Sequence, residues 1–151
     1  MYIKVYTFGK QNKSSLKDLQ AKYLILLSKW NVDLIFLKES KIGEVSDKQK
    51  ADFETLQKFI DPNYTPVLMD ERGDFLTSVQ FSNFLEDSAV NSKKLAFCLG
   101  GPFGFREEDK SFFKHKLGLS KMTLTHEMAE IILLEQLYRS YTILNNKKYH
   151  Y

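Results

Sequence analysis

The sequence has a single cysteine, three histidines and three prolines among its 151 residues. With Cys98 alone no internal disulfide can form, so a reducing compartment such as the cytoplasm is expected. A cysteine-based zinc site would need more histidines than the chain has, and no metal is expected. No stretch reaches the roughly 18 uninterrupted apolar residues of a membrane span, and the first residues lack the pattern of a signal peptide, so no membrane partner is expected.

The composition excludes a disordered or low-complexity chain. It is 43% hydrophobic, 27% charged and 14% aromatic, which is typical of a globular protein. The length predicts one domain, residues 1–151. A domain of this size buries roughly 68–70% of its unfolded surface, which is enough to fold without disulfides or metals.

The net charge is only +3, but the lysines gather in two segments. Residues 1–29 contain six lysines against Asp18 alone, a net charge of +5, and residues 110–125 contain four lysines and no acid, a net charge of +4. Two such segments in a nearly neutral chain favour a surface that binds a polyanion. Solvated lysines on helix surfaces are the alternative that charge alone leaves open.

Five short runs rich in apolar and β-branched residues predict strands. They are Tyr2–Phe8, Val32–Leu37, Thr65–Met69, Leu95–Leu99 and Lys116–Leu119. The run at 32–37 is almost continuously apolar, as expected for a strand that is covered on both faces. The charged residues 70–74 are expected to form a loop.

Capping residues and apolar stripes predict helices between the strands. Candidate N-caps of the first three helices are Ser14 or Ser15, Ser46 with Asp47, and Thr77 or Ser78. The second helix is expected to end before Asp61 because Pro62 follows it. A short helix is expected at Glu107–Phe113 and a long one from His126 to about Leu144. This alternation predicts an α/β fold with a mostly parallel sheet and helices on both faces.

Three loops follow predicted strands, at Met69–Gly73, Gly100–Gly104 and Leu119–Thr125. In open parallel sheets, ligands bind at the carboxyl ends of the strands, so these loops are the candidate site. Glycines let a backbone approach a ligand closely, although a simple strand-to-helix turn is the alternative for 100–104. The GxGxxG and P-loop spacings are absent, which disfavours a nucleotide-binding oxidoreductase.

Cys98 and His126 are reactive side chains that stand near the candidate loops. Cys98 lies inside an apolar strand, and burial in the core is the favoured interpretation because unpaired cysteine is among the most buried residue types. His126 stands beside the third loop, at the start of the last helix, where a capping or packing role is expected.

The last predicted helix is apolar around much of its circumference. Its apolar residues are Met128, Ile131, Ile132, Leu133, Leu134, Leu137 and Tyr138. A helix of this kind is buried on more than one side. A second subunit is expected to cover one of those sides, and a fully internal helix is the alternative.

Several motifs carry a resemblance to a known family. Residues 117–126 read LGLSKMTLTH and residues 132–139 read ILLEQLYR. The segments MDERG at 69–73 and GGPFG at 100–104, and the ending Tyr149-His150, complete the series in the same order. Over its whole length the sequence resembles the SPOUT-class 23S rRNA pseudouridine N3-methyltransferases, the RlmH type.

The resemblance implies a fold with a C-terminal trefoil knot, S-adenosylmethionine (SAM) as cofactor, and a homodimer as the active unit. It implies that the substrate is N3 of a pseudouridine in 23S ribosomal RNA, on the assembled ribosome. Methylation of another RNA such as tRNA, and a non-catalytic module that binds RNA or the ribosome, are the alternatives. By position, the implied SAM contacts are Met69, Gly100, Leu119, Ser120, Lys121, Met122, Thr123 and Leu124.

The acceptor nitrogen carries a proton that has to leave, so a base or an oxyanion stabiliser is expected near it. Tyr149 and His150, on the tail, are the favoured catalytic candidates, with Asp70, Arg72 and His126 behind them. A disordered terminus is the alternative reading of the tail.

Two residues depart from the family pattern near the expected site. Glu130 stands where the family usually has arginine, and it reverses a charge near the expected dimer and RNA surface. Thr125 replaces the proline before His126, so a looser turn is expected there.

Overall fold

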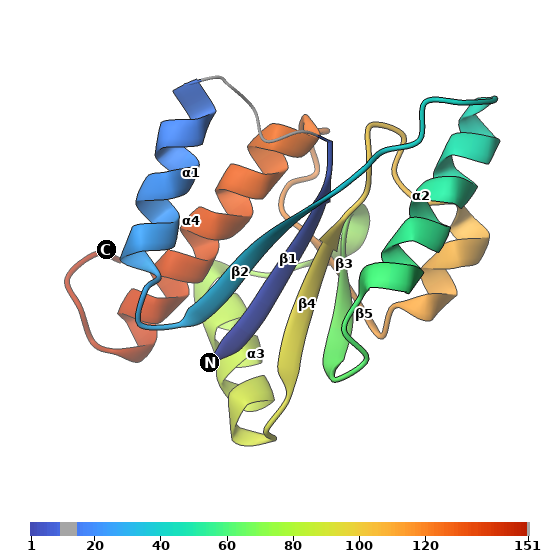
Figure 1. Cartoon of the computed structure of the whole chain (residues 1–151). Helices are drawn as coiled ribbons and strands as arrows, with labels where there is room; N and C mark the ends of the chain where they lie inside the picture. Colours follow the sequence, from blue (N-terminus) through green and yellow to red (C-terminus); the bar gives the residue numbers. More distant parts are fainter. Residues whose placement is uncertain (10–14, 151) are drawn as a thin grey trace.

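The computed structural model describes residues 1–9 and 15–150 (Figure 1). The candidate cap Ser14, two lysines of the basic N-terminal segment, Lys10 and Lys13, and the terminal Tyr151 lie outside these residues. The elements are, in order, β1 (Tyr2–Phe8), α1 (Ser15–Leu26), β2 (Asn31–Leu37), α2 (Val45–Phe59), β3 (Tyr64–Phe75), α3 (Ser78–Val90), β4 (Lys94–Leu99), the 3-10 helix η1 (Glu107–Phe112), β5 (His115–Gly118) and α4 (His126–Leu144).

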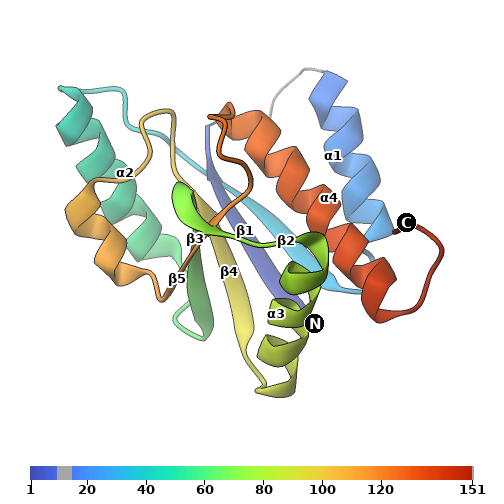
Figure 2. The ribbon, with the colours of Figure 1, turned by 180° about the vertical axis from the view of Figure 1, so that it is seen from behind.

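The strands form one parallel sheet in the order β2-β1-β4-β3-β5. Helices α1, α3 and α4 lie on one face of the sheet, and α2 and η1 lie on the other (Figures 1 and 2). The predicted α/β class, with a parallel sheet and helices on both faces, is confirmed. All strands end at the same rim, where the three candidate loops begin.

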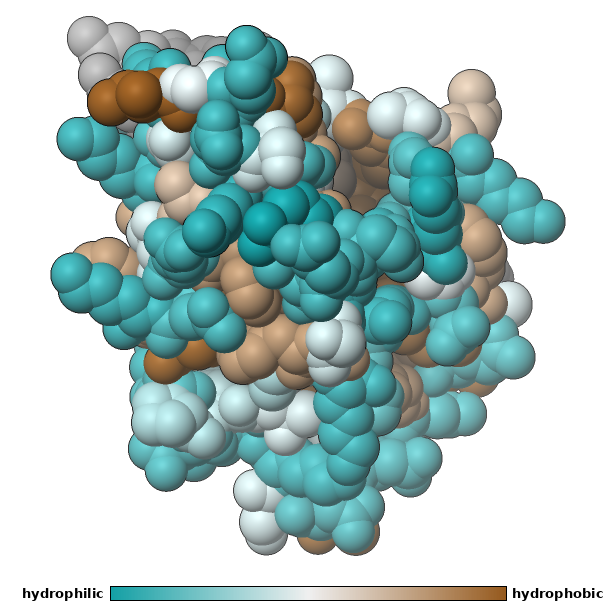
Figure 3. Space-filling model, turned by 90° about the vertical axis from the view of Figure 1, so that its right-hand side faces the viewer, coloured by the Kyte–Doolittle hydropathy of each residue, from teal (hydrophilic) through white to brown (hydrophobic). Residues whose placement is uncertain are grey.

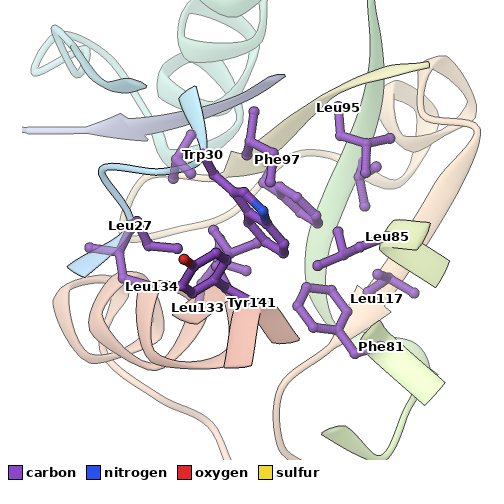
Figure 4. Packing of buried hydrophobic residues seen from close by; sticks show 14 of the residues in the cluster. Leu27, Trp30, Phe81, Leu85, Leu95, Phe97, Leu117, Leu133, Leu134 and Tyr141 are labelled. Atoms are coloured by element: carbon purple, nitrogen blue, oxygen red, sulfur yellow. The ribbon is translucent and has the colours of Figure 1, made fainter. Parts of the chain in front are cut away.

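Alternating residues of the strands feed two separate apolar clusters, as the pleat of a strand requires. Val5 and Phe97 point into the larger cluster, beneath α1, α3 and α4. Trp30, Phe97 and Tyr141 all belong to this cluster (Figure 4), and the rings of Trp30 and Tyr141 lie edge to face at 5.5 Å. Cys98 points into the smaller cluster, on the α2 side, and is fully buried. Its predicted core position is confirmed, and burial raises the pKa of its thiol.

The long last helix begins and ends at the predicted residues, His126 and Leu144. Leu133, Leu134 and Leu137 are fully buried, and α4 packs against α1 and α3 as well as β4. Neighbouring helices of the same chain thus cover one side of α4, whereas Met128 at its start is 41% exposed. The second subunit expected over the remaining apolar surface stays a prediction.

Strand β3 is longer than the sequence pattern indicated. Residues 70–74, predicted as a loop, continue the strand to Phe75. Asp74 and Phe75 pair with β5 beyond an irregularity between Met69 and Asp74. Met69 and Asp74 are both opposite Leu117. A Cβ atom on Gly73 would lie 2.7 Å from the Leu117 backbone, so glycine permits this close approach. The charged residues of this segment do not show the apolar pattern of a strand, and the extension of β3 is held by its pairing with β5.

Strand β2 lies at an edge of the sheet, and most of its side chains are only partly buried. Val32 and Leu34 pack against the larger cluster and Ile35 against the smaller one, so both faces of this strand are in contact with the core, as predicted.

One further expectation needs correction. Helix α2 begins at Val45, before the predicted caps, because Glu44 and Asp47 form a reciprocal capping box. Helix α3 starts as predicted, with Thr77 accepting a hydrogen bond from the Gln80 backbone N–H at 3.2 Å.

Within the two described ranges, none of the helices combines the length and the apolar character that a membrane span requires. The trefoil knot depends on how the last helix is threaded through the chain, and it stays a prediction.

Candidate functional site

A cavity of about 890 Å³ opens at the carboxyl ends of β3, β4 and β5. The three loops predicted as the candidate site, at 69–73, 100–104 and 119–125, all contribute to its walls, together with η1 and the first turn of α4. A volume of this size is within the usual range for a small-molecule site. The topology therefore brings together segments that are far apart in the sequence.

The predicted cofactor contacts gather in this cavity with one exception. The residues that line it are Met69, Gly100, Leu119, Ser120, Met122, Thr123 and Leu124. The exception is Lys121, whose Nζ lies 5.8 Å from the centre of the Phe75 ring, away from the lining. Lys121 is therefore placed at the edge of the site, whereas its neighbours face inward.

The glycine loop is a closed turn. The Gly104 N–H donates to the Gly101 carbonyl oxygen at 2.9 Å, which leaves Pro102 and Phe103 at the tip. Gly104 has a φ of +64°, a conformation that glycine adopts most easily. A Cβ atom on Gly100 would lie 2.8 Å from the Cα of Gly104. Any side chain at position 100 would therefore force this turn to move.

The loop from Leu119 to Thr125 is tied to its neighbours by side-chain hydrogen bonds. The Ser120 hydroxyl accepts a bond from the Met122 N–H at 2.9 Å, and the Thr123 hydroxyl donates to a Glu71 carboxylate oxygen at 2.8 Å. The Thr125 hydroxyl accepts a bond from the Met128 N–H at 3.3 Å and so caps α4. Thr125 thus fixes the start of the helix, and the looser turn expected before it stays a prediction.

A buried ion pair joins β3 to η1 at the cavity wall. Lys110 Nζ lies 2.7 Å from Asp70 Oδ2, and each side chain is 13% exposed. Burial by itself raises the pKa of Asp70, but hydrogen bonds from Lys110 and from the Arg72 N–H outweigh it and hold the pKa below its ordinary value. Asp70 is therefore a charged structural partner of Lys110 at neutral pH, which argues against its candidacy as a base.

The sequence analysis missed Asp52, which supports the glycine loop from behind. This carboxyl is buried on α2, accepts a hydrogen bond from the Ser40 N–H at 2.6 Å, and has its pKa raised by that burial. A Cβ atom on Gly101 would lie 2.9 Å from Asp52 Oδ2. An acid beside Phe53, within the apolar stripe of a helix, was the available signal.

The two predicted catalytic residues of the tail lie away from this cavity. The Tyr149 hydroxyl donates to a Glu135 carboxylate oxygen at 3.4 Å, and burial raises the pKa of Tyr149 to about 12. The Tyr149 ring lies 4.9 Å from the Arg139 guanidinium, and Nδ1 of His150 lies 3.4 Å from a terminal nitrogen of Arg139. The tail therefore packs on the second half of α4.

The cavity begins at the other end of this helix. His126 lines the cavity, and at 1.5 Å of rise per residue Arg139 lies about 20 Å further along the axis. Neither Tyr149 nor His150 is among the lining residues. Within one chain the structure does not bring the tail and the cavity together.

Glu130 is an internal residue rather than a surface one. It is 5% exposed, and it accepts a hydrogen bond from the Gln20 side-chain amide, which joins α1 to α4. Burial is the main cause that raises its pKa above the ordinary value of 4.5, against the opposing effect of Gln20. Within this chain Glu130 is a buried partner of Gln20, and the expected reversal of charge near a dimer or RNA surface stays a prediction.

Replacing Glu130 with glutamine is expected to stabilise the protein at about pH 8, by about 1 kcal/mol, since the variant buries no charge. An acid with a raised folded-state pKa loses stability as the pH rises through its unfolded value, so the gain should disappear at about pH 4. Urea unfolding at both pH values measures the difference. Glu86→Gln, at an exposed position of α3, is the control and should change little. A Glu130→Gln variant that is less stable at pH 8 would contradict the expectation.

Among the described residues, no group of three histidine, cysteine, aspartate or glutamate side chains is placed to hold a metal ion. The cavity walls instead combine apolar side chains, glycine backbone and paired charges. Such walls suit an organic ligand that has both an apolar ring and polar groups.

The fold and the position of the cavity define an α/β protein that binds a ligand at the carboxyl rim of a parallel sheet. Residues 1–150 match the family described as "Predicted SPOUT methyltransferase". The chain belongs to the SPOUT methyltransferase family.

Curated relatives match over most or all of the chain. The protein named "Ribosomal RNA large subunit methyltransferase H" from Malacoplasma penetrans is 33% identical over 157 residues, with 99% of both chains covered. The protein of the same name from Geobacter metallireducens is 34% identical, with 100% of this chain and 99% of the relative covered. That from Parabacteroides distasonis is 42% identical over 111 residues, covering 73% of this chain and 70% of the relative.

A solved structure shows the same fold at low sequence identity. A methyltransferase from Legionella pneumophila, in complex with bound SAM, aligns with a TM-score of 0.53 and 12% identity. The alignment covers 93% of this chain and 66% of that one. This likeness supports the architecture of the fold.

Proposed function

We propose that this protein is a SAM-dependent methyltransferase that methylates N3 of a pseudouridine in 23S ribosomal RNA, on the assembled ribosome in the cytoplasm. The observation that carries the proposal is the cavity itself, which gathers seven of the eight residues assigned to SAM from three separate loops. Relatives that match along almost the whole chain and are named for ribosomal RNA methylation support the choice of substrate.

The residues of the cavity fit SAM in shape and in chemistry. Met69, Leu119 and Leu124 offer apolar side chains against which an adenine ring can pack. The turn at Gly100–Gly104 leaves no room for a side chain at its base, so backbone groups are the surface that a ligand meets. We assign the apolar residues to the adenine and the backbone groups of the second and third loops to its polar atoms.

SAM supplies an electrophilic methyl group on a positively charged sulfur. The protein's contribution is then mainly positioning, because holding reactants in line removes much of the entropic barrier. Hydrogen bonds fix the loop at Ser120 and Thr123, and the ion pair between Asp70 and Lys110 fixes the opposite wall. These contacts hold the cavity in shape before any ligand enters.

The acceptor N3 must lose a proton, and we assign this step to the tail residues Tyr149 and His150. Within one chain they lie at the far end of α4 from the cavity. We therefore propose a homodimer in which the tail of the second copy reaches the cavity. Exposed apolar side chains near the first turns of α3 and α4 provide a surface for it, namely Phe75, Val79, Met122 and Met128.

The proposal is tested by methylating purified ribosomes, naked ribosomal RNA and tRNA side by side with labelled SAM. We expect label in ribosomes, at a pseudouridine identified by mass spectrometry of the RNA. Label confined to tRNA would transfer the proposal to another RNA substrate. SAM binding without transfer to any RNA, or no SAM binding in calorimetry, would favour a non-catalytic module.

A further inference from the structure

We propose that Phe103 is a stacking platform for a nucleobase at the mouth of the cavity, and that it sets the affinity for RNA rather than for SAM. This inference rests on the proposed function, since it names how that site holds its RNA. Phe103 lines the cavity and is nevertheless 53% exposed. A large apolar ring left in water beside a site is a candidate ligand contact.

The loop presents this ring in a fixed position. Phe103 is at the tip of the turn closed by the hydrogen bond from Gly104 to Gly101. The Phe103 carbonyl oxygen also accepts a hydrogen bond from the side-chain amide of Gln49, on α2, at 2.8 Å. Both contacts hold the backbone, so only the rotation of the side chain is left to be lost when a base stacks on the ring. An aromatic ring fixed in this way is a favourable platform for binding.

A cation stands next to the ring. Lys48 Nζ, also on α2, lies 5.7 Å from the centre of the Phe103 ring. An aromatic face beside a lysine suits a nucleotide, because the base can stack while the ammonium attracts the phosphate. RNA, with a flat base and an anionic backbone in every unit, fits this pair better than an apolar peptide does.

Phe105, the next aromatic residue along the chain, is a core residue and differs from Phe103 in its exposure. Phe105 is 5% exposed, and its ring stacks with Phe113 at 5.7 Å in the smaller apolar cluster. Phe103 is half exposed on the other side of Gly104, so its ring is available to a ligand.

The structure contains a matched control at the opposite end of α2. Phe59 is 58% exposed, and Lys58 Nζ lies 5.8 Å from the centre of its ring. It has the same exposure and the same cation as Phe103 but does not line the cavity. Phe59→Ala therefore removes an equivalent aromatic side chain at a position where no base is expected.

The test measures RNA binding and methyl transfer separately. Fluorescence anisotropy follows a short, fluorescein-labelled, single-stranded oligouridylate, and steady-state kinetics give KM and kcat with unmodified ribosomal particles. Phe103→Ala is expected to weaken oligouridylate binding and raise KM about tenfold, the size of one lost base–aromatic stack, with kcat little changed. Phe103→Tyr should restore both values and Phe103→Leu should not, while Phe59→Ala should match the wild type.

Four outcomes would contradict the stacking role of Phe103. Phe103→Ala could bind oligouridylate as tightly as the wild type, or it could lose affinity for SAM in calorimetry. Phe59→Ala could lose as much oligouridylate affinity as Phe103→Ala, or Phe103→Leu could keep the wild-type oligouridylate affinity and KM. The anisotropy measurement does not depend on methyl transfer. The proposal for Phe103 and the proposal that the protein is a methyltransferase can therefore be contradicted independently. If the wild type methylates nothing but Phe103→Ala still loses oligouridylate, the platform stands and the methyltransferase proposal falls.

Discussion

Replacing Gly100 with valine is expected to weaken SAM binding by about a hundredfold or more, the upper range of overpacking costs, while the chain stays folded. A Cβ atom at this position would lie 2.8 Å from the Gly104 Cα, so this turn, which lines the cavity, must change its shape. The displaced atoms belong to backbone and cannot move aside as a flexible side chain would. Isothermal titration calorimetry with SAM measures the loss, and circular dichroism checks the fold.

A matched control is available at Gly43, outside the cavity. A Cβ atom there would lie 2.9 Å from the Asp47 Cβ, and the residue has a φ of +92°. Gly43→Val therefore introduces similar crowding and more backbone strain, and it should cost stability but keep SAM affinity. Wild-type affinity in Gly100→Val would remove the glycine loop from the cofactor site, and a comparable loss in Gly43→Val would show a general effect on folding.

Ending the chain at Lys148 should reduce methyl transfer to ribosomal particles by about 10²–10⁴-fold, the usual contribution of acid–base groups. SAM affinity should not change, because neither Tyr149 nor His150 lines the cavity. Steady-state transfer and SAM calorimetry on the same preparation separate the two effects. Lys148→Ala, an exposed neighbour left in place, is the control and should keep full activity. Unchanged turnover after truncation would exclude the tail from the mechanism.

The same variants show which copy supplies the tail. Gly100→Val and the truncated chain should each be nearly inactive alone. When they are refolded together, a mixed dimer combines an intact cavity on one chain with an intact tail on the other. Recovery of activity supports the dimeric site, whereas an inactive mixture shows that a tail serves only its own chain.

The sequence was sufficient to predict the candidate site because the position of the site follows from the parallel arrangement of the strands. Parallel strands run to one rim, so the last part of β3 and the loops after β4 and β5 meet wherever they stand in the chain. Local signals placed the last helix correctly between His126 and Leu144. The hydroxyl of Thr125 caps its first turn, and the apolar residues after it repeat over the whole length.

What the sequence did not predict concerns contacts between distant segments, which local sequence does not encode. The polar residues 70–74 were predicted as a loop, but they continue β3, and the pairing of Asp74 and Phe75 with β5 holds the extension. The contact of Glu130 with Gln20, a buried partner on a distant helix, was not predicted either. The sequence also could not show which part of the apolar surface of α4 is covered by α1 and α3 of the same chain.

The length of helix α4 sets the distance between the cavity and the tail residues Tyr149 and His150. Its first residue, His126, faces the cavity, and its second half carries the packed tail. Inserting one residue inside α4 would turn everything beyond it by about 100° and push it about 1.5 Å further along the axis. Changes in chain length should therefore be accepted in connecting loops that do not line the cavity, whereas the span from His126 to Tyr149 should allow none.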